Sequence, residues 1–398
     1  MNTRFATLRR IPKGVWVLGG VSLLMDVSSE MIHSLLPLFM ATTLGASMVV
    51  IGLIEGLAEA TALIVKVFSG VLSDYLGKRK GLALLGYGLG AISKPVFAIT
   101  TSSGAVLGAR LSDRIGKGIR GAPRDALVAD VTPPELRGAA FGLRQSLDTI
   151  GAFLGPLLAM GLMVLWHNDF QAIFWVATIP AVLAVLLLLF GLKEPEQPVT
   201  HRRTNPLKRE NLRRLGRAYW WVVGIGAIFT LARFSEAFLV LRAQQMDIPL
   251  AFIPLVMVAM NVLYAFSAYP FGKLSDHISH TRMLQAALCV LIAADVVLAL
   301  STHWSGILLG VGLWGIHLGM SQGMLTAMIA NTAPADLRGT AYGMFNLMSG
   351  IALLIASVGA GLLWDTWGAA STFYVGAIIC VIALLCIRVA KHTYQAPQ

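Results

Sequence analysis

The chain has 398 residues, of which 56% are hydrophobic and 13% charged, and its mean hydropathy is +0.73. A soluble globular protein carries about 25% charged residues, so a soluble enzyme and a soluble nucleic-acid-binding protein are excluded despite the net charge of +11. Twelve apolar stretches follow one another along the chain, each long enough to cross a hydrocarbon core of about 30 Å. They are too long for barrel strands of about 10 residues, so the sequence predicts an all-α polytopic membrane protein with twelve transmembrane helices.

The predicted helices form two groups of six. In the first half they span residues 14–41, 49–73, 81–101, 104–130, 138–165 and 171–192. In the second half they span residues 218–244, 249–275, 283–301, 304–330, 338–364 and 370–390. The segment between the two groups is rich in proline and arginine, which is typical of a domain boundary. We therefore predict an N-terminal six-helix bundle at 1–192, a basic linker at 193–217 and a C-terminal six-helix bundle at 218–398.

The distribution of basic residues predicts the topology. Lysine and arginine gather near Arg10, near Lys80 and in the linker, whereas turns on the opposite side, such as 166–170, contain neither. By the positive-inside rule, both termini and the linker are expected on the cytoplasmic side of the cell (inner) membrane. The first helix contains Asp26 and Glu30 and is followed by further spans, so we interpret it as an anchor and not as a cleaved signal.

Two short sequences occur once in each half of the chain. Gly-Val-Leu-Ser-Asp at 70–74 recurs as Gly-Lys-Leu-Ser-Asp at 272–276, and the segment 134–142 recurs in similar form at 334–343. Each copy follows the same predicted helix of its half. The two halves are therefore predicted to be parallel repeats, related by pseudo-symmetry about an axis along the membrane normal.

The motif after the second helix resembles the cytoplasmic loop signature of the major facilitator superfamily (MFS) of secondary transporters. Its positions here are Gly70, Asp74, Gly77, Lys78 and Arg79, with Tyr75 where the family usually has a base. The second copy retains Gly272, Asp276 and Arg282. The fourth helix resembles a further signature through Arg114, Lys117 and Gly118, with lysine in place of the expected glutamine. The resemblance implies the MFS fold, alternating access and a gating role for Gly70, Asp74, Gly77, Arg79 and Asp276.

The fifth helix resembles the antiporter signature of the same family. The matching positions are Gly142, Gly151, Gly155 and Pro156, whereas Ala159 and Met160 replace its final pair of glycines. Glycine allows membrane helices to approach closely and proline bends a span, so helix packing alone also explains these residues. The resemblance implies the branch of proton-coupled drug and metabolite antiporters.

Many ionisable residues lie inside the predicted helices of the first half, where each costs several kcal/mol unless it faces a cavity or a partner. Pairing within a structural network is one interpretation, but apolar side chains would fill a packed interior at a lower desolvation cost. We therefore predict a water-filled cavity. Its candidate substrate contacts, with residues of the second half included, are His33, Arg110, Lys117, Arg144, Arg233, Glu236, His317, Met320 and Met324.

Proton coupling requires a carboxylate that binds a proton on one side of the membrane and releases it on the other. Asp26 and Glu30 are the leading candidates because they share one face of the first helix, opposite the bases of the fourth. The family resemblance associates Arg114 with proton transfer. The remaining candidate acids are Glu55, Glu59 and Asp148.

The sequence favours a proton-coupled antiporter that exports a small amphipathic organic molecule. An importer of an organic anion, of a siderophore-like metal chelate or of a soft metal ion is the alternative, and a non-transporting membrane receptor is a third possibility. Thioethers and the imidazole at His317, Met320 and Met324 would suit Cu(I), but no cysteine or second histidine joins them, so no metal site is assigned. No phosphate-binding loop is present, and we expect no enzyme activity and no cofactor. The expected partners are the substrate, protons and the lipid bilayer, and the expected state is a monomer.

Overall fold

The computed structural model describes residues 10–76, 79–194, 214–275, 277–334 and 337–394, which form helices joined by short turns, with no strand among them. The chain divides into two compact units. The first unit combines Met1–Leu36 with Thr61–Asn205, and the second combines Pro37–Ala60 with Pro206–Gln398. The first unit consists of helices from the first half of the sequence. The second unit consists mainly of helices from the second half but also contains residues 37–60, so one boundary between the units falls inside a long helix, α4 (Met48–Leu76).

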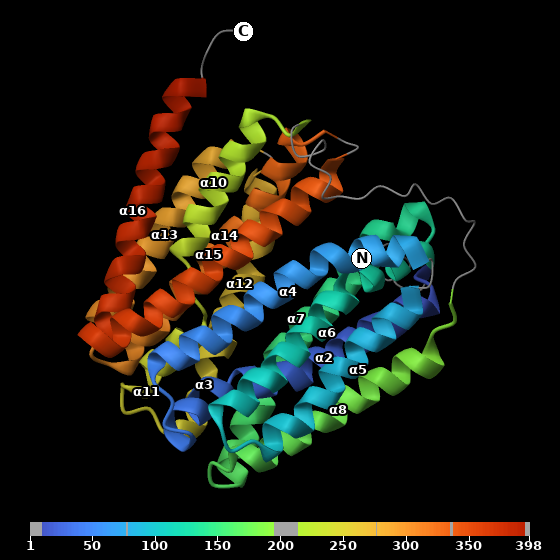
Figure 1. Ribbon diagram of the computed structural model, residues 1–398, viewed down its shortest axis with the longest axis horizontal. Helices are drawn as coiled ribbons and strands as arrows, with labels where there is room; N and C mark the ends of the chain where they lie inside the picture. The colour runs from blue at the N-terminus through green and yellow to red at the C-terminus, as the bar shows by residue number, and fades with distance from the viewer. Residues whose placement is uncertain (1–9, 77–78, 195–213, 276, 335–336, 395–398) are drawn as a thin grey trace, which may run out of the picture. The chain divides into compact units, whose positions relative to one another are not determined.

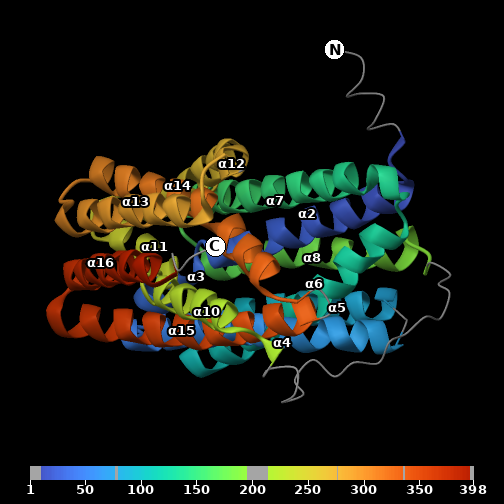
Figure 2. The ribbon, with the colours of Figure 1, turned by 90° about the horizontal axis from the view of Figure 1, so that it is seen from above.

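The N-terminal unit packs its helices around an apolar core. Besides the second half of α4 it contains α2 (Lys13–His33), α5 (Arg79–Ile99), α6 (Ser103–Asp130), the short 3₁₀ turn η2 (Pro134–Leu136), α7 (Arg137–Leu165) and α8 (Phe170–Gly191). Helix α5 packs between α6 and α8, and α2 packs against α7 and α8 (Figures 1 and 2). Leu18, Tyr87 and Leu188 are among the residues buried where α2, α5 and α8 meet.

The C-terminal unit has a comparable arrangement. It contains the first half of α4, α3 (Leu36–Leu38), the π-helix η1 (Phe39–Thr43), α10 (Arg217–Leu231), α11 (Ala237–Gln244), η3 (Leu250–Phe252), α12 (Leu255–Ser275), α13 (His280–Leu300), α14 (Trp304–Thr332), α15 (Arg338–Trp367) and α16 (Ala369–Tyr394). Helix α14 packs against α12 and α13, and α13 also packs against α16 (Figures 1 and 2).

Ten helices in the described part of the chain are long and apolar enough to cross a membrane. The prediction of an all-helical, multi-pass membrane protein is therefore confirmed. Two predicted spans are not among the ten. Helix α6 carries many charged residues, and α10 has only 15 residues because the predicted helix 218–244 is interrupted.

The prediction of one continuous helix at 218–244 is wrong, because this segment forms two helices, α10 and α11. Residues 232–236 leave the helix between α10 and α11, although they contain neither glycine nor proline. The backbone N–H of Ser235 donates to Ser357 Oγ at 3.2 Å, and Ser235 Oγ accepts from the N–H of Ala237 at 3.3 Å. These side-chain bonds replace bonds of the helical ladder, which explains how the break is tolerated in the interior of the unit.

The predicted helix 14–41 is also shorter than expected. Helix α2 ends at His33, and α3 and η1 follow it. Pro37 has no backbone N–H with which to continue the ladder, so an uninterrupted helix through this point would lose a bond to the carbonyl of His33. The other predicted helices begin and end within a few residues of the observed ones, apart from the N-terminal end of α12.

Helix α4 is held tightly to α15 within the C-terminal unit. Gly52 and Gly56 bring the backbone of α4 against Ser357 and Leu354, so that an added Cβ at Gly56 would lie 3.1 Å from the Cα of Leu354. Asp365 near the end of α15 accepts hydrogen bonds from the first two N–H groups of α4, at 3.1 and 3.0 Å. A carboxylate at a helix N-terminus satisfies free donors and complements the helix dipole. Asp365 therefore fastens the start of α4.

Replacing Asp365 by Ala should release this end of α4. The loss of a capping carboxylate costs about 1 kcal/mol, so amide exchange at Met48 and Val49 is expected to accelerate roughly 5-fold to 10-fold. Hydrogen–deuterium exchange of the purified protein, read by mass spectrometry on the peptide that begins α4, measures this. Asp169→Ala is the matched control, because Asp169 caps α8 through the N–H of Ala172 at 3.0 Å. Equal exchange of the α4 peptide in all three proteins would contradict the assignment.

Candidate functional site: a charged network in the N-terminal unit

Asp26 on α2 lies among charges from two neighbouring helices. Its carboxylate is within electrostatic reach of Asp148 on α7 and of Lys117, Arg120 and Arg124 on α6. The backbone around it is an uninterrupted α-helix, which directs its side chain to the face shared with Glu30. The predicted meeting of this acid with the bases of the fourth helix is present in the structure.

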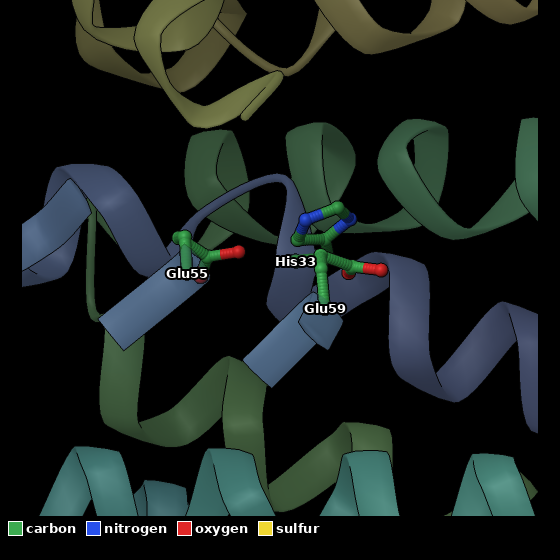
Figure 3. A group of neighbouring side chains, drawn as sticks. All are labelled: His33, Glu55 and Glu59. Carbon is green, nitrogen blue, oxygen red and sulfur yellow. The ribbon is translucent and has the colours of Figure 1, made fainter. Parts of the chain in front are cut away.

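Glu30 occupies the next turn of α2 and has different neighbours. Its Oε2 lies 3.5 Å from Nδ1 of His33, the last residue of α2, which is labelled in Figure 3. Lys117 and Arg114 on α6 also act on its charge. Lys117 thus interacts with both acids, whereas Arg114 is near Glu30 and Arg120 and Arg124 are near Asp26.

Two glycines of the predicted antiporter signature lie against these same two acids. A Cβ added at Gly151 would come within 2.9 Å of the Cβ of Asp26, and one at Gly155 within 2.7 Å of the Cβ of Glu30. Only glycine permits this backbone approach of α7 to α2. Pro156 is buried inside α7, whereas an added Cβ at Gly142 would meet nothing within 4 Å. The signature therefore determines how closely α7 covers Asp26 and Glu30.

A network of ion pairs connects Asp148 on α7 with residues near the C-terminal end of α6. Arg144 Nη1 bonds Asp148 Oδ2 at 2.7 Å, one helical turn away, and lies 3.6 Å from Asp125 Oδ1. Arg124 Nη1 lies 3.8 Å from Asp148 Oδ2 and donates to Ser22 Oγ on α2 at 3.2 Å. Asp148 is thus shared by one base of α6 and one of α7.

A second, more deeply buried pair joins α5 to α6. Lys94 Nζ lies 2.8 Å from Asp113 Oδ1 and donates to Ser29 Oγ on α2 at 3.0 Å, and both charged side chains are almost completely buried. Arg114 Nε lies 3.8 Å from the other oxygen of Asp113. Sequence reasoning missed Lys94. A lone lysine in the middle of an apolar helix was the available signal, because such a residue needs a buried partner.

Comparison with known proteins identifies the family. The model of the Major Facilitator Superfamily matches residues 18–246 and 222–397. The chain belongs to the major facilitator superfamily. An uncharacterized MFS-type transporter of Methanocaldococcus jannaschii is 34% identical over 382 residues, which cover 94% of each chain. This family membership identifies a membrane transporter and not an enzyme.

Solved structures of the MFS share the fold at low identity. A POT family transporter in complex with a thioalcohol-conjugated peptide superposes with a TM-score of 0.81 at 14% identity, covering 97% of both chains. The human organic anion transporter MFSD10 superposes with a TM-score of 0.63 at 20% identity, covering 95% of this chain and 99% of that one.

The MFS loop signature is only partly described. Gly70 and Asp74 lie in the last turns of α4, and Gly77 and Asp276 fall outside the described residues. Arg79, the first residue of α5, forms an ion pair with Asp130 at the end of α6. In this conformation Arg79 therefore fastens two helices of the same unit.

Glu55 and Glu59 belong to the part of α4 that lies in the C-terminal unit. They are one turn apart on the same side of the helix (Figure 3). Glu59 acts electrostatically on Arg233 in the break between α10 and α11, as does Glu236. These two candidate acids are therefore grouped with bases and acids of the second half of the sequence.

The remaining candidates of the second half lie on α14. His317 is buried, with Nδ1 at 3.2 Å from the carbonyl of Trp314 and its ring beside that of Phe229. Met320 and Met324 pack with Met283 in an apolar cluster between α13 and α14. This arrangement is hydrophobic packing and not a set of metal ligands. Arg110 on α6 is also buried.

Proposed function

We propose that the chain is a secondary active transporter that works by alternating access and is driven by protons. The observation that carries this proposal is the position of Asp26 and Glu30 between the bases of α6 and the signature glycines of α7. A base close to a carboxylate favours its ionised form, and exclusion of water favours its protonated form. A small displacement of α7 or α6 would change both influences, so these acids can bind and release a proton as the transporter changes conformation.

The remaining members of the network take supporting roles in this proposal. Arg114 acts on Glu30, and Asp148 shares Arg124 with Asp26. Glu55 and Glu59 are the alternative acids. The proposed substrate contacts are His33, Arg110, Lys117 and Arg144 in the N-terminal unit and Arg233, Glu236 and His317 in the C-terminal unit. Met320 and Met324 are left out, because they pack between two helices.

The proposed substrate is a small amphipathic organic molecule that leaves the cell in exchange for protons. The second candidate, transport of an organic anion, is favoured by the basic character of α6. That helix carries more basic than acidic residues, namely Arg110, Arg114, Lys117, Arg120 and Arg124 against Asp113, Asp125 and Asp130. The fold is also shared by the human organic anion transporter MFSD10.

A flux experiment separates the two candidates. Proteoliposomes that contain a pH-sensitive dye receive either a lipophilic organic cation or an aromatic carboxylate as the probe. Exchange of the cation against protons raises the internal pH, whereas entry of the anion together with protons lowers it. Uptake of a probe without any change of internal pH would show that proton coupling is wrong.

The proposed topology has twelve spans in two pseudo-symmetric bundles, at 1–192 and 218–398, with the linker 193–217 and both termini in the cytoplasm. Helix α6 is the fourth span, and α10 and α11 together form the seventh. We propose a monomer in the cell membrane, which is the inner one where a cell has two, because outer membranes are populated by barrels.

Cysteine labelling tests this topology. The native cysteines Cys289, Cys380 and Cys386 are first replaced, and Arg203→Cys or Asn168→Cys is then introduced. A membrane-impermeant maleimide added to whole cells should label the cysteine at 168 and reach the one at 203 only after permeabilisation. Labelling of both from the same side would contradict the proposed orientation.

Alternating access further requires that contacts of α4 be broken and remade. The helix is continuous, yet residues 48–60 belong to one unit and residues 61–76 to the other. A relative movement of the units must therefore bend α4 or release it from Asp365 and the glycines that hold it to α15. We propose that Gly70, Asp74, Gly77, Arg79 and Asp276 control the corresponding contacts at the loop signature.

A further inference from the structure

Asp295 on α13 is a buried acid with no role in the transport scheme above. Its side chain is completely buried, and neither Oδ1 nor Oδ2 has a hydrogen-bond partner among the described residues. The acids of the N-terminal network differ in this respect, since Asp113 and Asp148 each bond a base. An apolar residue would fill this position at a lower cost, so the carboxyl group itself needs an explanation.

The surroundings of Asp295 are apolar or thiol-bearing. Gly376 on α16 lies directly against it, so that an added Cβ there would be 2.8 Å from Oδ2 and 3.3 Å from the ring of Phe234. Cys380, one turn further along α16, is close enough to interact electrostatically with Asp295, and Cys289 on α13 in turn interacts with Cys380. Cys380 is therefore a titratable neighbour of Asp295 in the described part of the chain.

The basic groups of the neighbouring elements are engaged elsewhere. Arg242 on α11 donates to the carbonyls of Leu298, Ala299 and Ser301 at the end of α13. Arg233 interacts with Glu59 and Glu236. An ionised carboxylate without a partner in the interior of a membrane protein costs several kcal/mol. We infer that Asp295 carries a proton in this conformation.

Phe234 belongs to the non-helical segment 232–236 and, like Asp295, lies against the position of Gly376 on α16. Arg242 fixes α11 to the end of α13, so a bend at the break would move Phe234 relative to Asp295. The ring of Phe234 also packs on Trp314, at 5.4 Å between centroids, and the buried Nε1–H of Trp314 has no hydrogen-bond acceptor among the described residues. Withdrawal of Phe234 would thus open a path for water to the carboxyl group.

We propose that Asp295 is a second proton-binding site, located in the C-terminal unit and separate from Asp26 and Glu30. In the conformation described here the proton is bound to a carboxylate oxygen. When the break bends and Phe234 withdraws, the O–H bond breaks, the proton passes to water, and water hydrates the carboxylate that remains. The site extends the proposed transport cycle, but its occupancy can be measured without any substrate.

Infrared spectroscopy of the purified full-length protein in lipid tests this proposal. A protonated carboxyl group without hydrogen bonds gives a carbonyl band at high frequency. That band is expected in the wild type, should be absent in Asp295→Asn, and should remain in Asp169→Asn, whose carboxylate is exposed. In Phe234→Ala, which admits water, the band should vanish at a pH lower by about one unit or more than in the wild type.

Two results would overturn the proposal. If Asp295→Asn leaves the band unchanged, Asp295 is not the protonated group. If the wild-type band responds neither to alkaline pH nor to Phe234→Ala, the carboxyl is a fixed neutral group and binds no exchangeable proton. Should Asp295→Asn fail to fold, isotope-labelled aspartate must shift the band if an aspartate carries the proton, and the response of the labelled band to Phe234→Ala then distinguishes Asp295 from the other aspartates. No substrate is added, so failure of the transport proposal leaves these outcomes unaffected.

Discussion

Replacing the coupling acid, by Glu30→Gln or by Asp26→Asn, is expected to abolish accumulation of substrate against its gradient while exchange of substrate across the membrane continues. Each change removes a titrating group and keeps the shape of the side chain. The neighbouring bases remain, since Lys117 interacts with both acids and Arg114, Arg120 and Arg124 are held by further contacts. Without the proton-binding carboxylate, a pH gradient can no longer drive transport.

Proteoliposomes with an imposed pH gradient provide the measurement. Uptake that exceeds equilibrium in the wild type should fall to the equilibrium level in the variant that has lost the coupling acid. Asp169→Asn, at the exposed N-terminus of α8, is the matched control for the loss of one aspartate and should accumulate substrate normally. If both variants still accumulate substrate, the coupling acid lies elsewhere, and Glu55, Glu59, Asp148 and the second proposed proton site, Asp295, become the candidates.

The sequence predicted where helices lie better than where they are interrupted. Apolar length and basic flanks locate the spans, because each span must satisfy its own backbone hydrogen bonds in lipid. The break at 232–236 depends instead on Ser357, a residue more than a hundred positions away that accepts the N–H of Ser235. Such a tertiary bond leaves no local signal. The assignment of residues 48–60 to the C-terminal unit is equally non-local, since it depends on contacts of Gly52 and Gly56 with α15.

The candidate site was predictable in part. Periodicity placed Asp26 and Glu30 on one helix face, and the structure surrounds them with bases of α6 as expected. Periodicity gives no information on which partner each charge selects. The pairing of Asp113 with Lys94, and the lack of any partner for Asp295 among the described residues, follow from the packing of α5 on α6 and of α13 on α16.

Substitutions in the buried ion pair between Lys94 and Asp113 should lower the free energy of unfolding more than substitutions elsewhere in the N-terminal unit. Removing one member of a buried ion pair leaves an uncompensated charge and costs about 3–5 kcal/mol. The two members are not equivalent here. In Lys94→Met, Asp113 still has Arg114 Nε at 3.8 Å, whereas in Asp113→Leu both Lys94 and Arg114 lose their shared carboxylate. We therefore expect Asp113→Leu to be the more destabilising of the two.

A double-mutant cycle measures this difference. The free energy of unfolding of both single variants and of the combined variant is determined by denaturant titration in micelles, with loss of helical circular dichroism as the signal. The combined variant should be more stable than Asp113→Leu alone, because replacing both partners by apolar side chains removes the unpaired lysine. It should remain below the wild type, since the contact between Arg114 and Asp113 is still lost. A combined loss equal to the sum of the two single losses would show that Lys94 and Asp113 do not stabilise each other.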